Sequence, residues 1–413
     1  MVLYTLVKYL FNFCSRYQRR FFTIIPNRCR RIIINVIETM DSMIDYLVAV
    51  DAALVESDDI PTGCTDSVWI LGKRYNPVQE LELIRRDITT RIWCTYRRGF
   101  LAIGGSSPHK ITSDKGWGCM LRCGQMLLAQ SLLDLHLGRD WFWTPETRDP
   151  TYLKIINRFE DNRKSPFSIH QIALMGNSED KKVGEWFGPN TVAQVLKKLL
   201  KYDEWTSLNI HIALDNIIYL DDIQELCFEA ADKSWKPLLL IIPLRLGINE
   251  INPIYIDGLK RCFEINRNVG MIGGKPNQAL YFIGYVGDEV LYLDPHTTQR
   301  SGTVGEKNSS EEIEMDETFH QKFASRIPFV QMDPSLAVCF LCRTQLEFDE
   351  LYSRLLQDVL TGSYPLFEMI QTPQQPWLNP STQNRGDNQT DPTLGEFEEL
   401  DTRHSDEDFE IIA

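Results

Sequence analysis

A long segment of ordinary globular composition dominates this sequence and limits what the chain can fold into. It begins at Val68 and extends to about Met369, and only short polar stretches interrupt it. A segment of this length can bury a sizeable hydrophobic core. Hydrophobic residues make up 43% of the chain and aromatic residues 11%, which excludes a wholly disordered protein. We therefore expect a folded domain over residues 63–370.

The two ends of the chain differ in charge from this segment and from each other. Residues 1–37 carry seven basic side chains and no acidic one, whereas residues 387–413 carry ten acidic side chains and Arg403. The ends thus contribute +7 and −9 to a total of −14, which leaves −12 for the middle. The acidic balance argues against nucleic acid as a partner, because phosphate binding needs a basic surface. We expect a poorly ordered extension and linker over residues 1–62 and a disordered acidic tail over residues 371–413.

The basic end leaves more than one interpretation open. It resembles a mitochondrial presequence or a helix that lies on a membrane surface, and a poorly ordered extension is the simpler interpretation. Basic residues interrupt every apolar run in the chain before it reaches the ~20 residues of a membrane span.

The ten cysteines favour a reducing compartment and a cytoplasmic location. They are thinly spread along the chain and form no convincing zinc pattern, so we expect neither a metal nor a cofactor. Cys339 and Cys342 are spaced as C-x-x-C inside an apolar run, and we interpret them as buried thiols of a strand.

Apolar patterning predicts several elements of the folded segment. Residues 237–244 form a continuous apolar run of strand length, which indicates a buried strand. Residues 279–286 and 289–293 read as two strands joined by a tight turn. Residues 301–318 are polar and acidic and predict a surface loop.

Cys119 lies in the most informative stretch of the sequence. Gly116 and Gly118 supply a tight turn, and residues 120–133 have helical composition, so Cys119 is expected near a helix N-terminus. Free N–H groups and the helix dipole stabilise a thiolate there, and the same N–H groups can hold an oxyanion. A catalytic nucleophile and a core thiol both remain open for Cys119, whereas Cys123, one helical turn later, is expected in the core.

A thiolate nucleophile needs a base, which is usually a histidine. Among the seven histidines His296 stands apart, because it ends a predicted strand in the sequence Asp294-Pro295-His296. Pro295 keeps this segment extended, so Asp294 and His296 point to the same side and the carboxylate can orient the imidazole. The alternative is a turn in which Asp294 only caps the backbone. His136 and His211 fit structural positions.

The stretches around Cys119 and His296 closely resemble the autophagins, the cysteine peptidases that process the ubiquitin-like modifiers of autophagy. The resemblance covers roughly residues 66–370, in the family's order. The matching stretches are residues 68–72, 95–97, 116–125, 186–196, 243–247, 272–277 and 293–299.

The resemblance implies an α+β fold with a papain-like cysteine peptidase core and a small inserted subdomain at about 145–235. It implies that Cys119 is the nucleophile and that His296 acts first as general base and then as acid. Asp294 would fix the imidazole, and the hydroxyl of Tyr96 would join the N–H of Cys119 in the oxyanion hole.

The resemblance further implies a regulatory loop over the active site, which matches Lys275, Pro276, Asn277 and Gln278, with the indole of Trp186 beneath it. Such a lid admits only a thin chain, so the substrate needs glycine where its backbone passes the indole. The implied partners are GABARAP-type modifiers, cleaved after a C-terminal glycine as soluble precursors and released from phosphatidylethanolamine as lipid conjugates. Contact with autophagic membranes would then be peripheral, through the conjugate.

Phe409 and Ile412 form a second specific feature, close to the acidic end of the sequence. Their spacing behind a run of acids resembles the short linear motif that binds GABARAP-type modifiers, in which an extended peptide adds to a sheet edge and two side chains fill pockets. A solvated acidic tail is the alternative. Two other functions compete with the main one: a peptidase that acts on another ubiquitin-like modifier, and a non-catalytic scaffold that only binds the modifier.

Overall fold

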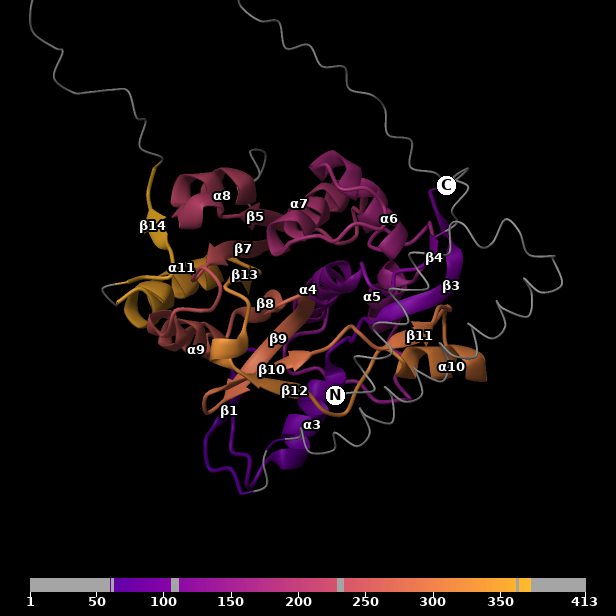
Figure 1. Ribbon diagram of the computed structural model, residues 1–413, viewed down its shortest axis with the longest axis horizontal. Coiled ribbons are helices and arrows are strands. Elements are labelled where there is room, and N and C mark those ends of the chain that lie inside the picture. The colour runs from indigo at the N-terminus through magenta and orange to yellow at the C-terminus, as the bar shows by residue number, and fades with distance from the viewer. Residues whose placement is uncertain (1–59, 61–62, 105–110, 229–233, 362–363, 373–413) are drawn as a thin grey trace, which may run out of the picture. The chain divides into compact units, whose positions relative to one another are not determined.

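The computed structural model describes residues 60, 63–104, 111–228, 234–361 and 364–372, and its centre is a nine-stranded sheet (Figure 1). Along the main path the strands are β12 (Ser325–Pro328), β10 (Glu289–Leu293), β9 (Gln278–Val286), β8 (Asn268–Lys275), β13 (Ser335–Cys342), β7 (Leu238–Arg245) and β5 (Asn209–Ile212). Off this path, β1 (Val68–Ile70) pairs with β9 and with β2 (Lys73–Tyr75). All neighbours are antiparallel except β5 and β7, which run parallel.

Alternate side chains of the central strands pack into two hydrophobic cores, one on each face of the sheet. On β9, Tyr281 and Ile283 belong to one core, whereas Leu280 and Phe282 belong to the other. A sheet that is covered on both faces needs apolar side chains at every position, so its strands appear as unbroken apolar runs. This confirms the buried strand predicted from residues 237–244, and β9 and β10 confirm the predicted pair with its tight turn.

The helices cover the two faces of this sheet. On one face, α4 (Cys119–His136) packs against β8 and β9, and on the other face α9 (Ile256–Glu264) contacts the same strands. Every residue of α4 from its start to Leu133 is buried, as expected for a helix surrounded by other elements. The remaining α-helices of the described residues are α3 (Leu81–Thr90), α5 (Pro150–Ile156), α6 (Ile169–Met175), α7 (Pro189–Leu199), α8 (Leu220–Cys227), α10 (Ser310–Glu317) and α11 (Gln345–Arg354).

Besides the central sheet, the described part of the chain forms two small sheets. In the first, β3 (Tyr96–Ile103) lies between β11 (Thr298–Arg300) and β4 (Ile111–Ser113). The pairing of β3 with β11 is parallel, with Tyr96 opposite Thr298, and it joins segments that are about 200 residues apart in the chain. The second small sheet pairs β14 (Glu368–Ile370) with β6 (Ile217–Tyr219).

The surface loop predicted for residues 301–318 is wrong over residues 310–317, which form α10, whereas residues 301–309 contain no helix or strand. A capping box formed by Ser309 and Glu312 starts the helix. The ammonium of Lys307 and the carboxylate of Asp316 form an ion pair at 2.6 Å, and both side chains are fully buried. Polar side chains of this stretch therefore make buried contacts as well as contacts with solvent.

The expectations for the two ends of the chain and for the inserted subdomain stay predictions. Residues 1–59 and 373–413 lie outside the described part of the chain, and the boundaries of the inserted subdomain at 145–235 stay a prediction. Within the described residues, no helix combines the length and the apolar character that crossing a membrane requires.

Candidate active site

Cys119 begins helix α4, at the position that its sequence context predicts. Gly118 is the N-cap residue, and Gly116 adopts a φ of +86°, a conformation that side chains with a Cβ rarely adopt. The carbonyl of Asp114 accepts the N–H groups of Trp117 and Gly118 at 3.2 and 2.9 Å, which closes the turn in front of the helix. The thiol is 3% exposed, so the free end of the helix dipole acts on it with little screening.

His296 and Asp294 follow strand β10 and contact each other directly. The Nδ1 atom of His296 lies 2.5 Å from Oδ1 of Asp294, and the backbone N–H of His296 donates to the same oxygen at 2.8 Å. The two interpretations that the sequence left open for Asp294 are therefore both realised, since its carboxylate caps the backbone and holds the imidazole at once.

Two contacts with distant segments fix this loop in space. The indole N–H of Trp93 donates to the carbonyl of Asp294 at 2.8 Å, and the backbone N–H of Tyr96 donates to the carbonyl of Pro295, also at 2.8 Å. Trp93 is a residue of the site that the sequence did not single out. No local pattern could have found it, because the contact spans 201 positions.

Tyr96 contacts both the thiol of Cys119 and the imidazole of His296. Its ring meets the ring of His296 edge-on, with centroids 5.4 Å apart, and its hydroxyl contacts the sulfur of Cys119 and the backbone N–H of Gly116. Burial and the nearby thiol raise the pKa of Tyr96, so the phenol keeps its proton and remains a hydrogen-bond donor.

The electrostatics of the cluster favour a thiolate and an imidazolium. Burial alone raises the pKa of Cys119, but hydrogen bonds from His296, from the N–H of Ala279 and from Tyr96 outweigh it and bring the pKa below its usual value. Burial likewise lowers the pKa of His296, yet its contacts with Asp294 and Cys119 raise it to about 9. At neutral pH the pair can therefore carry opposite charges, which is the reactive form of a cysteine nucleophile.

The predicted lid residues form the turn between β8 and β9. Lys275 pairs with Gln278, and the two turn residues between them are Pro276 and Asn277, the latter with a φ of 66°. Ala279, which follows Gln278, directs its N–H at the sulfur of Cys119, so this end of the hairpin lies beside the thiol. No feature of the sequence indicates this backbone contact.

The remaining predicted residues fall into two groups. Trp186 is 50% exposed and directly precedes Phe187, which is fully buried. Helix α7 begins two residues after Phe187, at Pro189. The position of Trp186 beneath the lid stays a prediction. Phe409 and Ile412 lie outside the described residues.

The other histidines of the described segments lie elsewhere in the fold. The rings of His136 and Trp205 stack 4.2 Å apart, and His211 belongs to β5, as expected for structural positions. Burial lowers the pKa of both imidazoles. In the described segments, no group of three or more His, Cys, Asp or Glu side chains is placed to hold a metal ion.

Comparison with known proteins identifies the family. A family model described as the peptidase C54 catalytic domain matches residues 81–354. The chain is 44% identical over 382 residues to the cysteine protease ATG4B of Xenopus laevis. The match covers 87% of this chain and 96% of that protein. It is 43% identical over 396 residues to ATG4B of Gallus gallus, and the match covers 88% of this chain and 98% of that protein. It is 42% identical over 380 residues to the cysteine protease ATG4A of Homo sapiens, and the match covers 84% of this chain and 93% of that protein. The chain therefore belongs to the peptidase C54 family, the autophagins, and is a cysteine-type peptidase.

Proposed function

We propose that this peptidase cleaves ubiquitin-like modifiers of autophagy on the carboxyl side of a C-terminal glycine, with Cys119 as nucleophile. The observation that carries the proposal is the contact of one thiol with an imidazole and a phenol, in a site where the pKa of the thiol is lowered and that of the imidazole is raised. Family membership supplies the class of substrate.

Acylation follows from the charge state of the pair. The thiolate of Cys119 attacks the carbonyl carbon of the substrate's glycine, and the new oxyanion accepts hydrogen bonds from the hydroxyl of Tyr96 and the backbone N–H of Cys119. The protonated Nε2 of His296 then donates its proton to the leaving nitrogen as the C–N bond breaks. A thioester between the modifier and the enzyme results.

Deacylation uses the same groups, with the direction of proton transfer at His296 reversed. The now neutral His296 removes a proton from water, and the hydroxide attacks the thioester carbonyl. The C–S bond breaks and the thiolate of Cys119 is restored, while His296 holds the proton. Asp294 keeps the Nδ1–H of the ring engaged throughout, so that Nε2 always faces the reaction.

The hairpin between β8 and β9 restricts what can reach the thiol. Its turn residues Pro276 and Asn277 are exposed, while the N–H of Ala279 contacts the sulfur. We propose that this turn covers the site as a lid together with the indole of Trp186. A glycine passes most easily, because it has no Cβ to meet the indole.

The same chemistry extends to the lipid-conjugated modifier. Precursor cleavage and release from phosphatidylethanolamine both break an amide to the carbonyl of the same glycine. The enzyme would therefore act on soluble and on membrane-bound GABARAP-type modifiers, and it would reach membranes only through the conjugate. The cysteine content favours the cytoplasm as the place of this activity. Phe409 and Ile412 would bind the modifier outside the catalytic domain.

Cleavage of a modifier precursor that carries residues beyond its glycine tests the proposal. Mass spectrometry should show a product that ends at that glycine for the wild type and no product for Cys119→Ser. His296→Ala should abolish turnover and retain substrate binding. Cleavage of another ubiquitin-like modifier at the same rate would favour the alternative substrate, and binding without cleavage would favour the scaffold.

The tail motif needs a separate measurement. Replacing Phe409 and Ile412 together by alanine should weaken modifier binding, measured by calorimetry, and change kcat on soluble precursor little. Unchanged affinity would make the acidic end a solvated tail.

A further inference from the structure

A buried ion pair connects the strand that begins with Tyr96 to the helix that begins with Cys119. Asp114 lies in the turn between β4 and α4, and Arg122 lies in the first turn of α4. The two side chains are 0% and 1% exposed, and Nε of Arg122 donates to Oδ2 of Asp114 at 2.8 Å. Neither residue has a part in the chemistry proposed above.

The remaining contacts of Asp114 reach the neighbours of both reactive residues. Its Oδ1 accepts the backbone N–H of Arg97 at 2.7 Å, and its own N–H donates to the carbonyl of Arg97 at 3.3 Å. Its carbonyl accepts the N–H of Gly118 at 2.9 Å. Arg97 directly follows Tyr96 and Gly118 directly precedes Cys119, so one residue holds both segments.

Arg122 is itself held by several partners. Its second arm donates from Nη1 to Oδ1 of Asp161 at 2.8 Å and to Oε1 of Gln125 at 3.0 Å. Its backbone N–H donates to the carbonyl of Gly118 at 2.9 Å. Asp114 thus contacts a guanidinium that cannot move independently of α4.

The turn in front of Cys119 is shaped around the carboxylate of Asp114. A Cβ on Gly118 would overlap this carboxylate, so only glycine fits there. The N–H of Gly116, within the same turn, contacts the hydroxyl of Tyr96. A shift of the carboxylate would therefore move the thiol and the phenol relative to each other.

Stability alone does not explain a buried ion pair in this place. Well-packed apolar residues can often replace such a pair without loss of stability, and its best-attested use is to select one arrangement of the groups around it. The arrangement selected here is the spacing between β3 and the start of α4.

We infer that Asp114, held by Arg122, is a positioning residue that sets the distance between the hydroxyl of Tyr96 and the sulfur of Cys119. The inference rests on the proposed function, in which Tyr96 stabilises the oxyanion. Errors of about 1 Å in such geometry lower rates by up to about 10²-fold, so the effect is measurable.

A double-mutant cycle in the full chain tests the inference. Asp114→Asn keeps an acceptor for the N–H of Arg97 but presents an amide N–H to Arg122. In the wild-type background we expect kcat per titrated Cys119 thiol to fall about tenfold, with KM within twofold. In the Tyr96→Phe background the same change should lower kcat less than twofold, because the hydroxyl that Asp114 positions is already gone.

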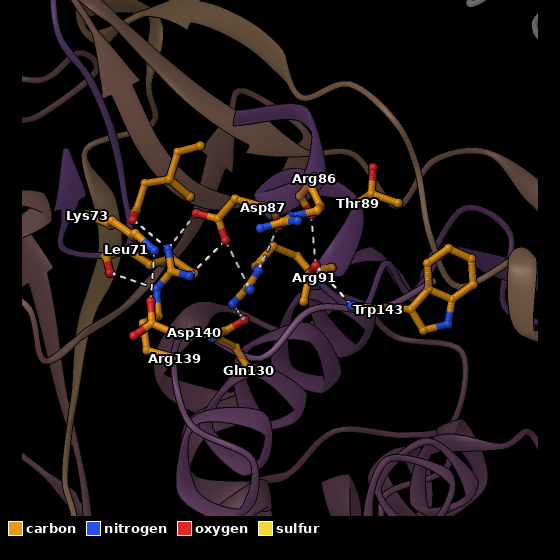
Figure 2. A network of polar contacts seen from close by, with 12 residues as sticks. Leu71, Lys73, Arg86, Asp87, Thr89, Arg91, Gln130, Arg139, Asp140 and Trp143 are labelled. Atoms are coloured by element: carbon orange, nitrogen blue, oxygen red, sulfur yellow. Dashed lines mark hydrogen bonds and ion pairs between the residues drawn. The ribbon is translucent and has the colours of Figure 1, made fainter. Parts of the chain in front are cut away.

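Asp87→Asn is the matched control. Asp87 is a buried carboxylate of α3 that pairs with Arg91 at 3.1 Å and with Arg139 at 2.6 Å, in the network of Figure 2. Through Arg91 this network reaches Gln130 on α4, about 16 Å along the helix from Cys119. The control should lower Tm and leave kcat per thiol near the wild-type value in both backgrounds.

The outcomes separate the inference from the proposed function. If Asp114→Asn lowers kcat by the same factor in both backgrounds, or lowers only Tm, the positioning role is wrong while the peptidase stands. If Tyr96→Phe keeps full kcat, the oxyanion role and the inference both fail. If Asp114→Asn does not fold, Arg122→Lys, which keeps the charge and loses Nε, should give the same non-additivity with Tyr96→Phe, and additivity would overturn the inference.

Discussion

Oδ1 of Asp294 accepts the backbone N–H of His296 at 2.8 Å and lies 2.5 Å from its ring Nδ1, so one oxygen orients both parts of the residue. The ring is thereby held with Nε2 toward Cys119. Burial lowers the pKa of His296, but the contacts with Asp294 and Cys119 outweigh burial and raise it to about 9.

Asp294→Asn should show how much of catalysis depends on this charge. Asparagine keeps the shape of the side chain and loses the negative charge, so the imidazolium loses support and the pKa of His296 falls. Activity needs the imidazolium, hence kcat/KM declines as pH rises through that pKa, and the alkaline limb should move from about pH 9 to lower pH. We expect kcat to fall on the order of 10²- to 10⁴-fold, measured with pH–rate profiles.

Asp288→Asn is a suitable control, because this carboxylate is fully exposed and pairs with Lys260 at the opposite end of β10. It should leave the profile unchanged. An alkaline limb that stays in place in Asp294→Asn would contradict the assignment of Asp294.

Trp93→Phe tests the contact that anchors the loop of Asp294. Phenylalanine keeps an aromatic ring and removes the N–H that donates to the Asp294 carbonyl at 2.8 Å. Because the loop then loses one of its two distant anchors, we expect kcat to fall about 5- to 10-fold with KM within twofold, an effect of about 1 kcal/mol on the barrier. Initial rates on a modifier precursor give both constants.

Trp235→Phe provides the comparison for this variant. The N–H of Trp235 is buried and has no hydrogen-bond partner among the described residues, so the same substitution there removes no hydrogen bond within that part of the chain. Equal losses of kcat in the two variants would mean that packing, and not the hydrogen bond, explains the effect of Trp93→Phe.

The parts of the site that the sequence predicts are those set by local rules. The glycines before Cys119 indicated a helix start, and the short Asp294-Pro295-His296 segment indicated a carboxylate beside an imidazole. Both follow from backbone geometry over a few residues. The family resemblance, which rests on longer stretches, added the fold and the roles.

The parts that the sequence does not predict depend on pairings between distant segments. The parallel pairing of Tyr96 with Thr298 and the contact of Ala279 with the thiol have no local signature. Helix α10 was missed for a different reason. Its capping box, Ser309 and Glu312, can be recognised in the sequence, but the charged composition of the stretch suggested exposure. The burial of Asp316 depends on the ion pair that Lys307 forms with it.

Asn277 allows a test of the hairpin beside the thiol. Its φ of 66° suits glycine and asparagine, whereas a β-branched residue in this conformation costs about 1–2 kcal/mol. Asn277→Gly should leave Tm and KM near their wild-type values. Asn277→Val should lower Tm and, because the hairpin end carries Ala279, change the rate at which iodoacetamide alkylates Cys119. Identical alkylation rates in the two variants would show that the turn does not affect the thiol.

His320 makes stability depend on pH, apart from any catalysis. Its Nδ1 lies 2.7 Å from the carbonyl of Thr89, and its ring is stacked on Trp143 with centroids 3.8 Å apart. Burial lowers its pKa to about 4. The unfolded chain therefore binds a proton that the folded protein excludes between about pH 6.5 and 4, so the free energy of unfolding falls as pH falls through this window, by at most about 1.4 kcal/mol per pH unit from this group.

His320→Gln removes this titration. The variant should be less stable than the wild type at pH 7, because it loses the ring, but its stability should change less between pH 7 and pH 5. Urea midpoints at both values of pH measure the difference. His136→Gln, at a site that is only partly buried, should reduce the dependence less. An undiminished pH dependence in His320→Gln would mean that the folded protein accommodates the protonated ring.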